Sequence, residues 1–295
     1  MRFPFGKCLR TCCPSWKKNQ VCQHVLNNFV ILPRYNFDMR KLSLIIVLGI
    51  VVAIIGCRRN QEVRPAQVLP SEDKSQFVTI TDVVPDAILE IRYYSTYNFV
   101  GARVDGYLAP TALLTKPAAD SLRAVSDELK AQGYRIKIFD AYRPQCAVDH
   151  FVRWASDITD TLMKPYFYPE VPRDSLFELG YIAKKSGHTR GSTVDLTLFD
   201  MTTEKEVDMG GTFDWFGNES HPDFCGDPET GEYTGDNSAS PIGRSITPEQ
   251  FENRMILRCA MLRHGFKPID EEWWHFTLKD EPFPDTYFTF PVETH

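Results

Sequence analysis

Two histidines lie in sequence contexts that suggest metal chemistry. His188 lies within SGHTRGSTVD (residues 186–195), seven residues before Asp195, and His275 directly follows EEWW. Catalytic zinc commonly takes three nitrogen or oxygen ligands and keeps its fourth position for water or substrate. Two imidazoles and one carboxylate meet that count, so His188, Asp195 and His275 form a candidate ligand set. Spacing alone also allows a structural or surface role for each histidine.

The same segments resemble the zinc D-Ala-D-Ala peptidases, peptidase family M15. SGHTRGSTVD is similar to that family's SxHxxGxAxD signature, except that Ser192 and Thr193 surround the usual small residue. EEWWH is similar to its ExxWH element. Five further blocks resemble the dipeptidase branch of the family: Asp105–Tyr107, Asp140–Pro144, Asp195–Leu198, Met209–Gly210 with Phe213–Asp214, and Asp280–Pro284. The resemblance extends over residues 78 to 292.

This resemblance implies a zinc peptidase that holds one Zn2+ per chain through His188, Asp195 and His275. Glu272, three residues before His275, would be the general base that takes a proton from the attacking water. Arg143, in the DAYRP block, would stabilise the negative oxygen of the tetrahedral intermediate, which requires a fixed positive donor. An ordinary surface role or a share in substrate binding remains open for Arg143.

The implied substrate is the dipeptide D-Ala-D-Ala. Ser186 would donate to its terminal carboxylate, and Asp214 would pair with its free ammonium. Reading both charged ends limits the substrate to two residues. Tyr94 and Tyr107 would line the small D-alanine pocket, although each aromatic ring is equally compatible with the hydrophobic core.

Two other functions remain open. A D,D- or L,D-carboxypeptidase or endopeptidase that trims peptidoglycan peptides would share the ligand pattern in a more open cleft. The DAYRP, DLTL and Asp214 blocks favour the dipeptidase. A zinc-bearing binding protein without catalysis would have to lack the base or a ligand, and the sequence contains all of them.

The elements that must position these side chains can be predicted from periodicity and capping signals. The apolar alternation in residues 193–199 predicts a strand in which Asp195 points away from the side that Leu196 packs. Thr247–Gln250 forms a capping box that predicts a helix as far as Gly265. The other predicted elements are a helix from Thr115, which caps it, to Gly133, a strand over 134–139, a helix containing Val148, Phe151 and Val152, and a strand over 273–278.

These elements predict a single α+β domain with a central antiparallel sheet and helices packed on one side of it. The family resemblance implies the D-Ala-D-Ala peptidase or hedgehog-like zinc peptidase fold, with the zinc site in a cleft. Residues 218–244 are rich in Gly, Asp, Ser and Pro and have no apolar period. We expect them to form a long loop, with a role as a lid over the site left open.

The N-terminal region predicts secretion. Arg40 and Lys41 precede Leu42–Gly56, fifteen residues in which Ser43 is the one polar side chain, and Cys57 follows. A membrane-spanning helix needs about 20 apolar residues, so a cleaved signal fits better than an anchor helix. The segment ending at Cys57 resembles a bacterial lipobox, which implies a lipid on Cys57. We therefore expect a membrane-tethered protein of the bacterial cell envelope, facing the periplasm or exterior, with a cytoplasmic location as the alternative.

The domain boundaries follow from these signals. Met39 directly precedes the basic pair, so residues 1–38 are expected to be a non-functional upstream extension. Residues 39–56 would be the signal, 57–76 the lipidated N-terminus and tether, and 77–295 the zinc dipeptidase domain.

Composition narrows the possible partners. The 295 residues are 43% hydrophobic and 24% charged, as in an ordinary globular domain. From Cys57 onward, 25 Lys and Arg oppose 38 Asp and Glu, a net charge of −13. This charge argues against nucleic acid as a partner. Cys146, Cys225 and Cys259 are an odd set, so no disulfide framework is predicted, and the sequence does not determine the oligomeric state.

Overall fold

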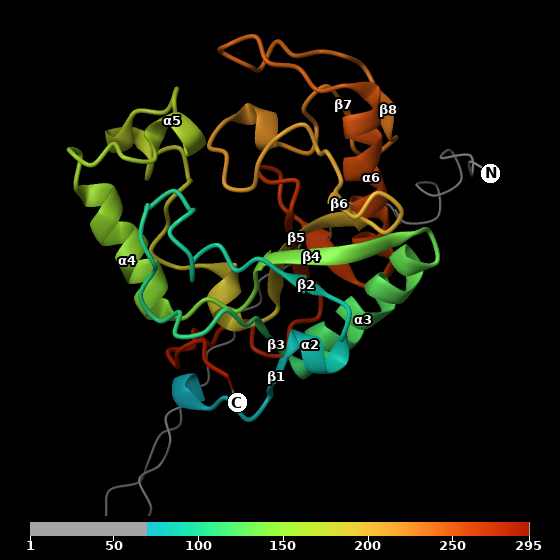
Figure 1. The fold of residues 1–295 in the computed structure, drawn as a ribbon. Coiled ribbons are helices and arrows are strands. Elements are labelled where there is room, and N and C mark those ends of the chain that lie inside the picture. The colour runs from blue at the N-terminus through green and yellow to red at the C-terminus, as the bar shows by residue number, and fades with distance from the viewer. Residues whose placement is uncertain (1–69, 295) are drawn as a thin grey trace, which may run out of the picture. The chain divides into compact units, whose positions relative to one another are not determined.

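Strand β5 (Thr193–Asp200) lies at the centre of the described part of the chain, residues 70–294 of the computed structural model (Figure 1). It pairs antiparallel with β4 (Tyr134–Asp140) on one side and with β10 (His275–Leu278) on the other. Strand β9 (Phe266–Pro268) continues the sheet beyond β10. The predicted strands over 134–139, 193–199 and 273–278 are therefore confirmed, with shifts of one or two residues at their ends.

The sheet is mixed, which corrects the expectation of a purely antiparallel one. Strand β2 (Ile88–Leu89) pairs parallel with β4, while the short β6 (Lys205–Glu206) pairs antiparallel with the end of β5. Strand β2 is only two residues long, too short for apolar periodicity to reveal it. The predicted α+β class is confirmed, with a mixed sheet in place of a purely antiparallel one.

Alternation along β5 separates two chemically different faces. Val194, Leu196 and Leu198 are fully buried on one face. Asp195 is on the other face, as predicted, and only 2% of it is exposed. The polar face is therefore directed into the protein, where its side chains require polar partners.

Helix α3 (Lys116–Lys130), predicted over this segment, buries Leu122, Val125 and Leu129 and packs against β4. The side chain of Thr115 does not cap this helix, contrary to prediction. Its hydroxyl oxygen lies 2.7 Å from that of Ser192, so the polar group is used in a tertiary contact. The left-handed Gly133 follows the helix, where its φ of 92° permits the chain to turn into β4.

Helix α6 (Pro248–Arg263) begins with the predicted capping box. The Thr247 side chain accepts a hydrogen bond from the backbone N–H of Gln250, and the Gln250 side chain accepts one in return. Helix α6 packs against α3 and β9, whereas α4 (Gln145–Ser156) follows the C-terminal end of β4 and lies away from α3 and α6 (Figure 1). Helices α3 and α6 thus pack on the sheet as predicted, and the side of the sheet on which α4 lies stays a prediction.

Residues 218–244 are more ordered than a plain loop. They contain the turn η6 (Asn218–Ser220) and a hairpin of β7 (Gly226–Asp227) and β8 (Glu232–Tyr233). Phe224 and Cys225 from this stretch are buried in a small second core with Ile246, Phe251 and Met255. Two adjacent buried residues are too few to produce a recognisable apolar periodicity, so the sequence did not reveal this packing.

The remaining short elements connect these parts. Strands β1 and β3 form a separate antiparallel pair. The bounds are η3 (Pro70–Glu72), β1 (Phe77–Thr79), α2 (Ile80–Val83), β3 (Leu113–Thr115), α5 (Lys164–Phe167), η4 (Arg173–Ser175) and η5 (Gly187–Arg190).

The predictions for the N-terminal region fall outside the described residues. They concern residues 1–38, the signal 39–56, Cys57 and most of the tether 57–76. Among the helices between residues 70 and 294, none has the length and apolar character needed to cross a membrane.

Candidate active site

His188 is presented by the short turn η5. The Ser186 side chain caps this turn by accepting a hydrogen bond from the backbone N–H of His188 at 3.3 Å. Gly191 ends it with φ of 80°, in the left-handed region. The ring Nδ1 of His188 lies 2.7 Å from the carbonyl oxygen of Ala141, to which its N–H donates. This bond leaves the Nε2 lone pair free to bind a metal ion, the usual arrangement of a histidine ligand.

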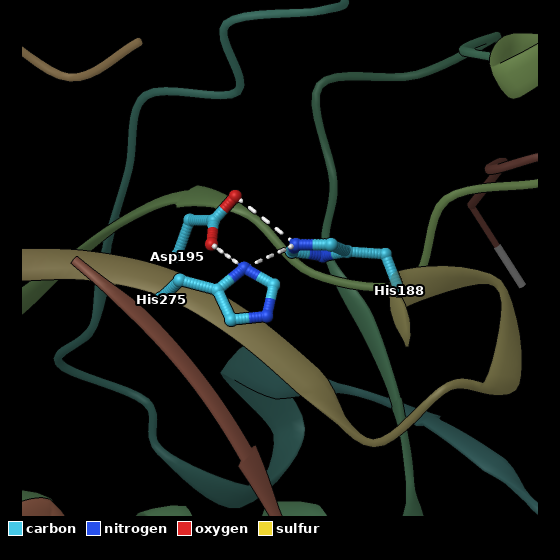
Figure 2. A group of neighbouring side chains, drawn as sticks. All are labelled: His188, Asp195 and His275. Carbon is cyan, nitrogen blue, oxygen red and sulfur yellow. Dashed lines mark hydrogen bonds and ion pairs between the residues drawn. The ribbon is translucent and has the colours of Figure 1, made fainter. Parts of the chain in front are cut away.

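Strand register brings the other two candidate ligands together. Asp195 on β5 is directly opposite His275 on β10 in the antiparallel ladder, so both side chains lie on the same face. His188 and Asp195 are each 2% exposed, and His275 is partly buried. Side chains from three separate elements, η5, β5 and β10, thus converge at one point (Figure 2).

The donor atoms have the spacing that a single zinc ion requires. His188 Nε2 lies 3.2 Å from Asp195 Oδ2 and 3.2 Å from His275 Nδ1, and His275 Nδ1 lies 3.1 Å from Asp195 Oδ1 (Figure 2). Two ligand atoms about 2.0–2.1 Å from one tetrahedral ion are separated by about 3.3 Å. Asp195 Oδ1 is buried and its near neighbour is the ring nitrogen of His275, itself a candidate ligand, so the oxygen retains a lone pair for a cation.

The electrostatics of this cluster favour positive charge. Burial lowers the pKa of His275, but hydrogen bonds with Asp195 and Glu272 raise it overall, to about 9. Burial raises the pKa of Asp195, yet His188 and His275 outweigh it and hold that pKa well below its usual range. The cluster therefore retains its carboxylate charge and attracts either a proton or a metal cation.

Glu272 lies beside the candidate ligands and faces the cavity. Its Oε2 is 3.4 Å from His275 Nδ1, and its side chain is 30% exposed. A carboxylate that is close to the ligands and accessible to water is suited to proton transfer. Its neighbour Glu271 is exposed and does not line the cavity.

Arg143 lies beside the ligand Asp195, in the segment after β4. Its Nη2 is 2.9 Å from Asp140 Oδ2 and 3.6 Å from Asp195 Oδ2. The guanidinium lies over the rings of Tyr93 and Phe151, 4.9 and 5.3 Å from their centroids. The side chain is thus a fixed cation next to the ligands, as stabilisation of an oxyanion requires.

Asp140 supports this arrangement, although its sequence block gave it no role. Its side chain is 1% exposed; Oδ2 accepts from Arg143, and Oδ1 accepts from the hydroxyl of Tyr107 at 2.6 Å. Tyr107 therefore lies behind Asp140 and does not line the cavity, which corrects its predicted place in a substrate pocket. The sequence signal that could have indicated this role is the position of Asp140, an acid at the end of a strand and three residues before Arg143.

Asp214 lines the cavity with an unsatisfied carboxylate. It is 5% exposed; Oδ1 accepts a hydrogen bond from the Tyr93 hydroxyl at 3.1 Å, while Oδ2 has no hydrogen-bond partner among the residues that the structure describes. Its φ of 62° is unusual for a residue other than glycine. Burial raises the pKa of Asp214 well above its usual value, and the negative charges of Glu272 and Asp195 raise it further. A cationic group on a ligand would give Oδ2 a partner and would offset the repulsion between Asp214 and the carboxylates of Glu272 and Asp195.

The tyrosine prediction is displaced by one residue. Tyr93 lines the cavity, whereas Tyr94 lies outside its lining and stacks with Arg103, whose guanidinium is 5.2 Å from the ring centroid. Nothing in the sequence distinguishes the two adjacent rings, because the segment between Arg92 and Asn98 lacks a regular period.

The cavity has a volume of about 270 Å³, near the lower end of the range for small-molecule sites. One wall comes from residues 180–187, which the sequence did not single out except at Ser186. In that wall, the ring of Tyr181 stacks on that of Phe216, with 4.7 Å between the ring centroids. No residue of the 218–244 stretch lines this cavity, so its proposed role as a lid has no support in the described structure.

Comparisons with known proteins agree with these observations. The family described as D-ala-D-ala dipeptidase, Peptidase M15, matches residues 73–231 and 236–293. A D-alanyl-D-alanine dipeptidase of Enterococcus faecalis is 38% identical over 216 residues, 73% of this chain and 98% of that protein. One of Streptomyces coelicolor is 37% identical with the same coverage, and one of Escherichia coli is 28% identical over 206 residues, 70% and 86% of the two chains.

Proposed function

Because the chain belongs to the Peptidase M15 family of D-Ala-D-Ala dipeptidases, we propose that it hydrolyses D-alanyl-D-alanine to D-alanine with the help of one zinc ion. The observation that carries this proposal is the convergence of His188, Asp195 and His275 beside Glu272 in one small cavity. The proposal includes the D-Ala-D-Ala peptidase or hedgehog-like fold and a role in cell-wall peptide metabolism.

The metal would be held by His188 Nε2, Asp195 and His275 Nδ1. When bound, zinc supplies Lewis acidity, which lowers the pKa of water to about 7 and polarises a carbonyl group. The Ala141 carbonyl keeps the proton of His188 on Nδ1, so the ligand nitrogen remains unprotonated. Asp195 remains ionised because the adjacent imidazoles favour its charged form.

Glu272 moves the proton in this mechanism. Its carboxylate takes a proton from the attacking water as the oxygen adds to the peptide carbonyl. The same group then gives that proton to the departing amino group, so that each turnover consumes one water and restores the carboxylate. Arg143 faces the developing negative charge with its guanidinium already fixed by Asp140.

The two charged ends of the dipeptide would be recognised separately. Asp214 Oδ2 is available for the ammonium because no group in the described part of the chain forms a hydrogen bond with it. The Ser186 hydroxyl accepts a hydrogen bond from His188 N and still has its own O–H to donate to the carboxylate. Arg143, whose guanidinium lies next to the ligand Asp195, would face the bond to be cleaved.

Asp214 favours a dipeptidase over a D,D- or L,D-carboxypeptidase or endopeptidase. A longer peptide would place an uncharged amide against this buried carboxylate and leave it without a counter-ion. The decisive experiment compares D-Ala-D-Ala with N-acetyl-D-Ala-D-Ala and a muropeptide pentapeptide, each with and without chelator. Chelator-sensitive release of D-alanine from the free dipeptide alone supports the proposal. Release from the pentapeptide alone would identify a carboxypeptidase instead.

We also propose that the protein is tethered to the bacterial cell envelope through lipid on Cys57. The proposal rests on the basic pair, the apolar run Leu42–Gly56 and the cysteine that follows. An enzyme in that location would encounter wall-derived dipeptide. The test is detergent-phase partitioning of the wild type and of Cys57→Ala; partitioning into the aqueous phase by both would contradict it.

A further inference from the structure

Arg254 on α6 is a buried cation that the mechanism above does not use. It is 1% exposed, and no carboxylate among residues 70–294 forms an ion pair with it. Burial lowers its pKa to about 9. Burying a charge without an ion-pair partner is unfavourable, so the contacts that this side chain makes instead are informative.

Within residues 70–294, its guanidinium donates only to backbone carbonyls of one segment. Nε donates to Met209 O at 2.7 Å, Nη2 to Glu219 O at 3.0 Å and Nη1 to His221 O at 3.3 Å. The planar guanidinium thus connects both ends of residues 209–221 to α6. Lysine cannot reproduce this pattern, because its donors all radiate from one nitrogen.

The segment held in this way carries part of the candidate active site. Asp214, with its left-handed backbone, and Phe216 both face the cavity from it. The guanidinium of Arg254 lies 5.6 Å from the ring centroid of Trp273. The backbone N–H of Trp273 donates to Ser220 O at 2.9 Å. Arg254 therefore contacts the base of the Asp214 segment and the residue next to Glu272.

We infer that Arg254 is a positioning residue for substrate recognition: by holding both ends of residues 209–221, it keeps the free oxygen of Asp214 directed at the ammonium of the substrate. The inference rests on the proposed role of Asp214 in binding that ammonium. A non-glycine residue with positive φ persists only where its surroundings enforce it, and the three carbonyl contacts of Arg254 supply that constraint.

The matched variants are Arg254→Lys and Arg258→Lys. Arg258 is on the same helix one turn later, is 8% exposed, and pairs with Glu229 outside the cavity. For D-Ala-D-Ala hydrolysis we expect Arg254→Lys to raise KM about tenfold with little change in kcat, because hydrogen bonds to a charged group are lost. Arg258→Lys should leave KM unchanged. Arg254→Gln, which retains an amide donor, is the second variant, with the same expected pattern.

Coupling to Asp214 separates positioning from a general structural effect. In an Asp214→Asn background, Arg254→Lys should cause no further rise in KM, since the group it positions is already lost. Hydrogen–deuterium exchange should increase in residues 209–221 of Arg254→Lys and not of Arg258→Lys. Unchanged exchange there, or multiplicative KM effects in the double variant, overturns the inference. If the wild type hydrolyses no dipeptide, the proposed function is wrong. The hydrogen–deuterium exchange measurement still decides whether Arg254 holds residues 209–221 in place.

Discussion

Glu272 can be separated from the metal ligands by a substitution that retains its shape. Glu272→Gln removes the proton acceptor but keeps hydrogen-bonding capacity 3.4 Å from His275. We expect kcat to fall about 10²- to 10⁴-fold, the usual contribution of a general base, while about one zinc ion per chain remains bound. Steady-state kinetics and atomic absorption measure the two effects. Glu271→Gln is the control, because Glu271 is exposed and outside the cavity.

Asp214 should trade stability for function. Because its folded pKa is raised by burial and by neighbouring acids, ionisation of Asp214 favours the unfolded chain. Its contribution to stability is fully present below the unfolded pKa and is lost as pH rises toward the folded pKa. Asp214→Asn should therefore be more stable than the wild type at pH 7, yet have a higher KM for D-Ala-D-Ala.

Denaturant unfolding at pH 4 and pH 7 tests the sign of that effect. The gain of Asp214→Asn over the wild type should be larger at pH 7 than at pH 4, because only at the higher pH must the wild type, on folding, bury or protonate a carboxylate that is ionised in the unfolded chain. Tyr93→Phe removes the one hydrogen bond to Asp214 Oδ1 without changing charge, so it should show no such pH-dependent gain. Equal gains at the two pH values for Asp214→Asn would contradict the assignment.

A sequence motif identifies residues at fixed positions, but it does not show how their side chains are oriented or what supports them. His188, Asp195 and His275 were identifiable because each occupies a fixed position in a recognisable block, and the structure brings the three together. Tyr94 was misplaced because a motif does not record which of two adjacent side chains turns inward. Asp140 was overlooked because its importance lies in what it holds, the Arg143 guanidinium.

At the scale of the element, the turn η5 depends on Gly191. A Cβ there would lie 2.3 Å from the Phe77 ring, and φ is already 80°. We expect Gly191→Ala to lower the free energy of unfolding by more than about 1 kcal/mol and to weaken zinc binding, because His188 would be displaced. Denaturant unfolding and zinc titration against a competing chelator measure these effects.

Gly243→Ala is the matched control for that substitution. Its φ is 68°, but nothing lies within 4 Å of the added methyl group. Both variants therefore place alanine in a left-handed backbone conformation, but only Gly191→Ala also brings the added methyl group into collision with Phe77. Zinc affinity should be unchanged in Gly243→Ala, and an equal loss in both would show that the contact with Phe77 is unimportant.

Elements with strong local signals were predictable, and those defined by pairing were not. The capping box at Thr247 and the alternation in β5 are local, so sequence placed α6 and β5 within a few residues. Sheet order and the parallel pairing of β2 depend on tertiary contacts. The 218–244 stretch was predicted as a loop because its few buried anchors, such as Phe224, have no period.

At the scale of the whole molecule, a bound ion would connect parts of the fold that the chain itself separates. The three candidate ligands come from η5, β5 and β10, and 87 positions separate His188 from His275. An ion that binds the folded state and not the unfolded chain stabilises it by about 4 kcal/mol at a free concentration 1,000 times its Kd. We therefore expect zinc to raise the Tm of the chelator-treated protein by roughly 10 °C.

Differential scanning calorimetry of the chelator-treated protein, with and without added zinc, measures that shift. His188→Ala should show little or none of it, because a site with two ligands loses most of its affinity, whereas His150→Ala should retain it, since His150 pairs with Asp105 away from the cavity. Magnesium at the same concentration should have little effect, because it binds oxygen ligands and does not suit two imidazoles. A zinc-induced shift of equal size in His188→Ala and the wild type would place the stabilising ion elsewhere and remove the physical basis for this metal centre.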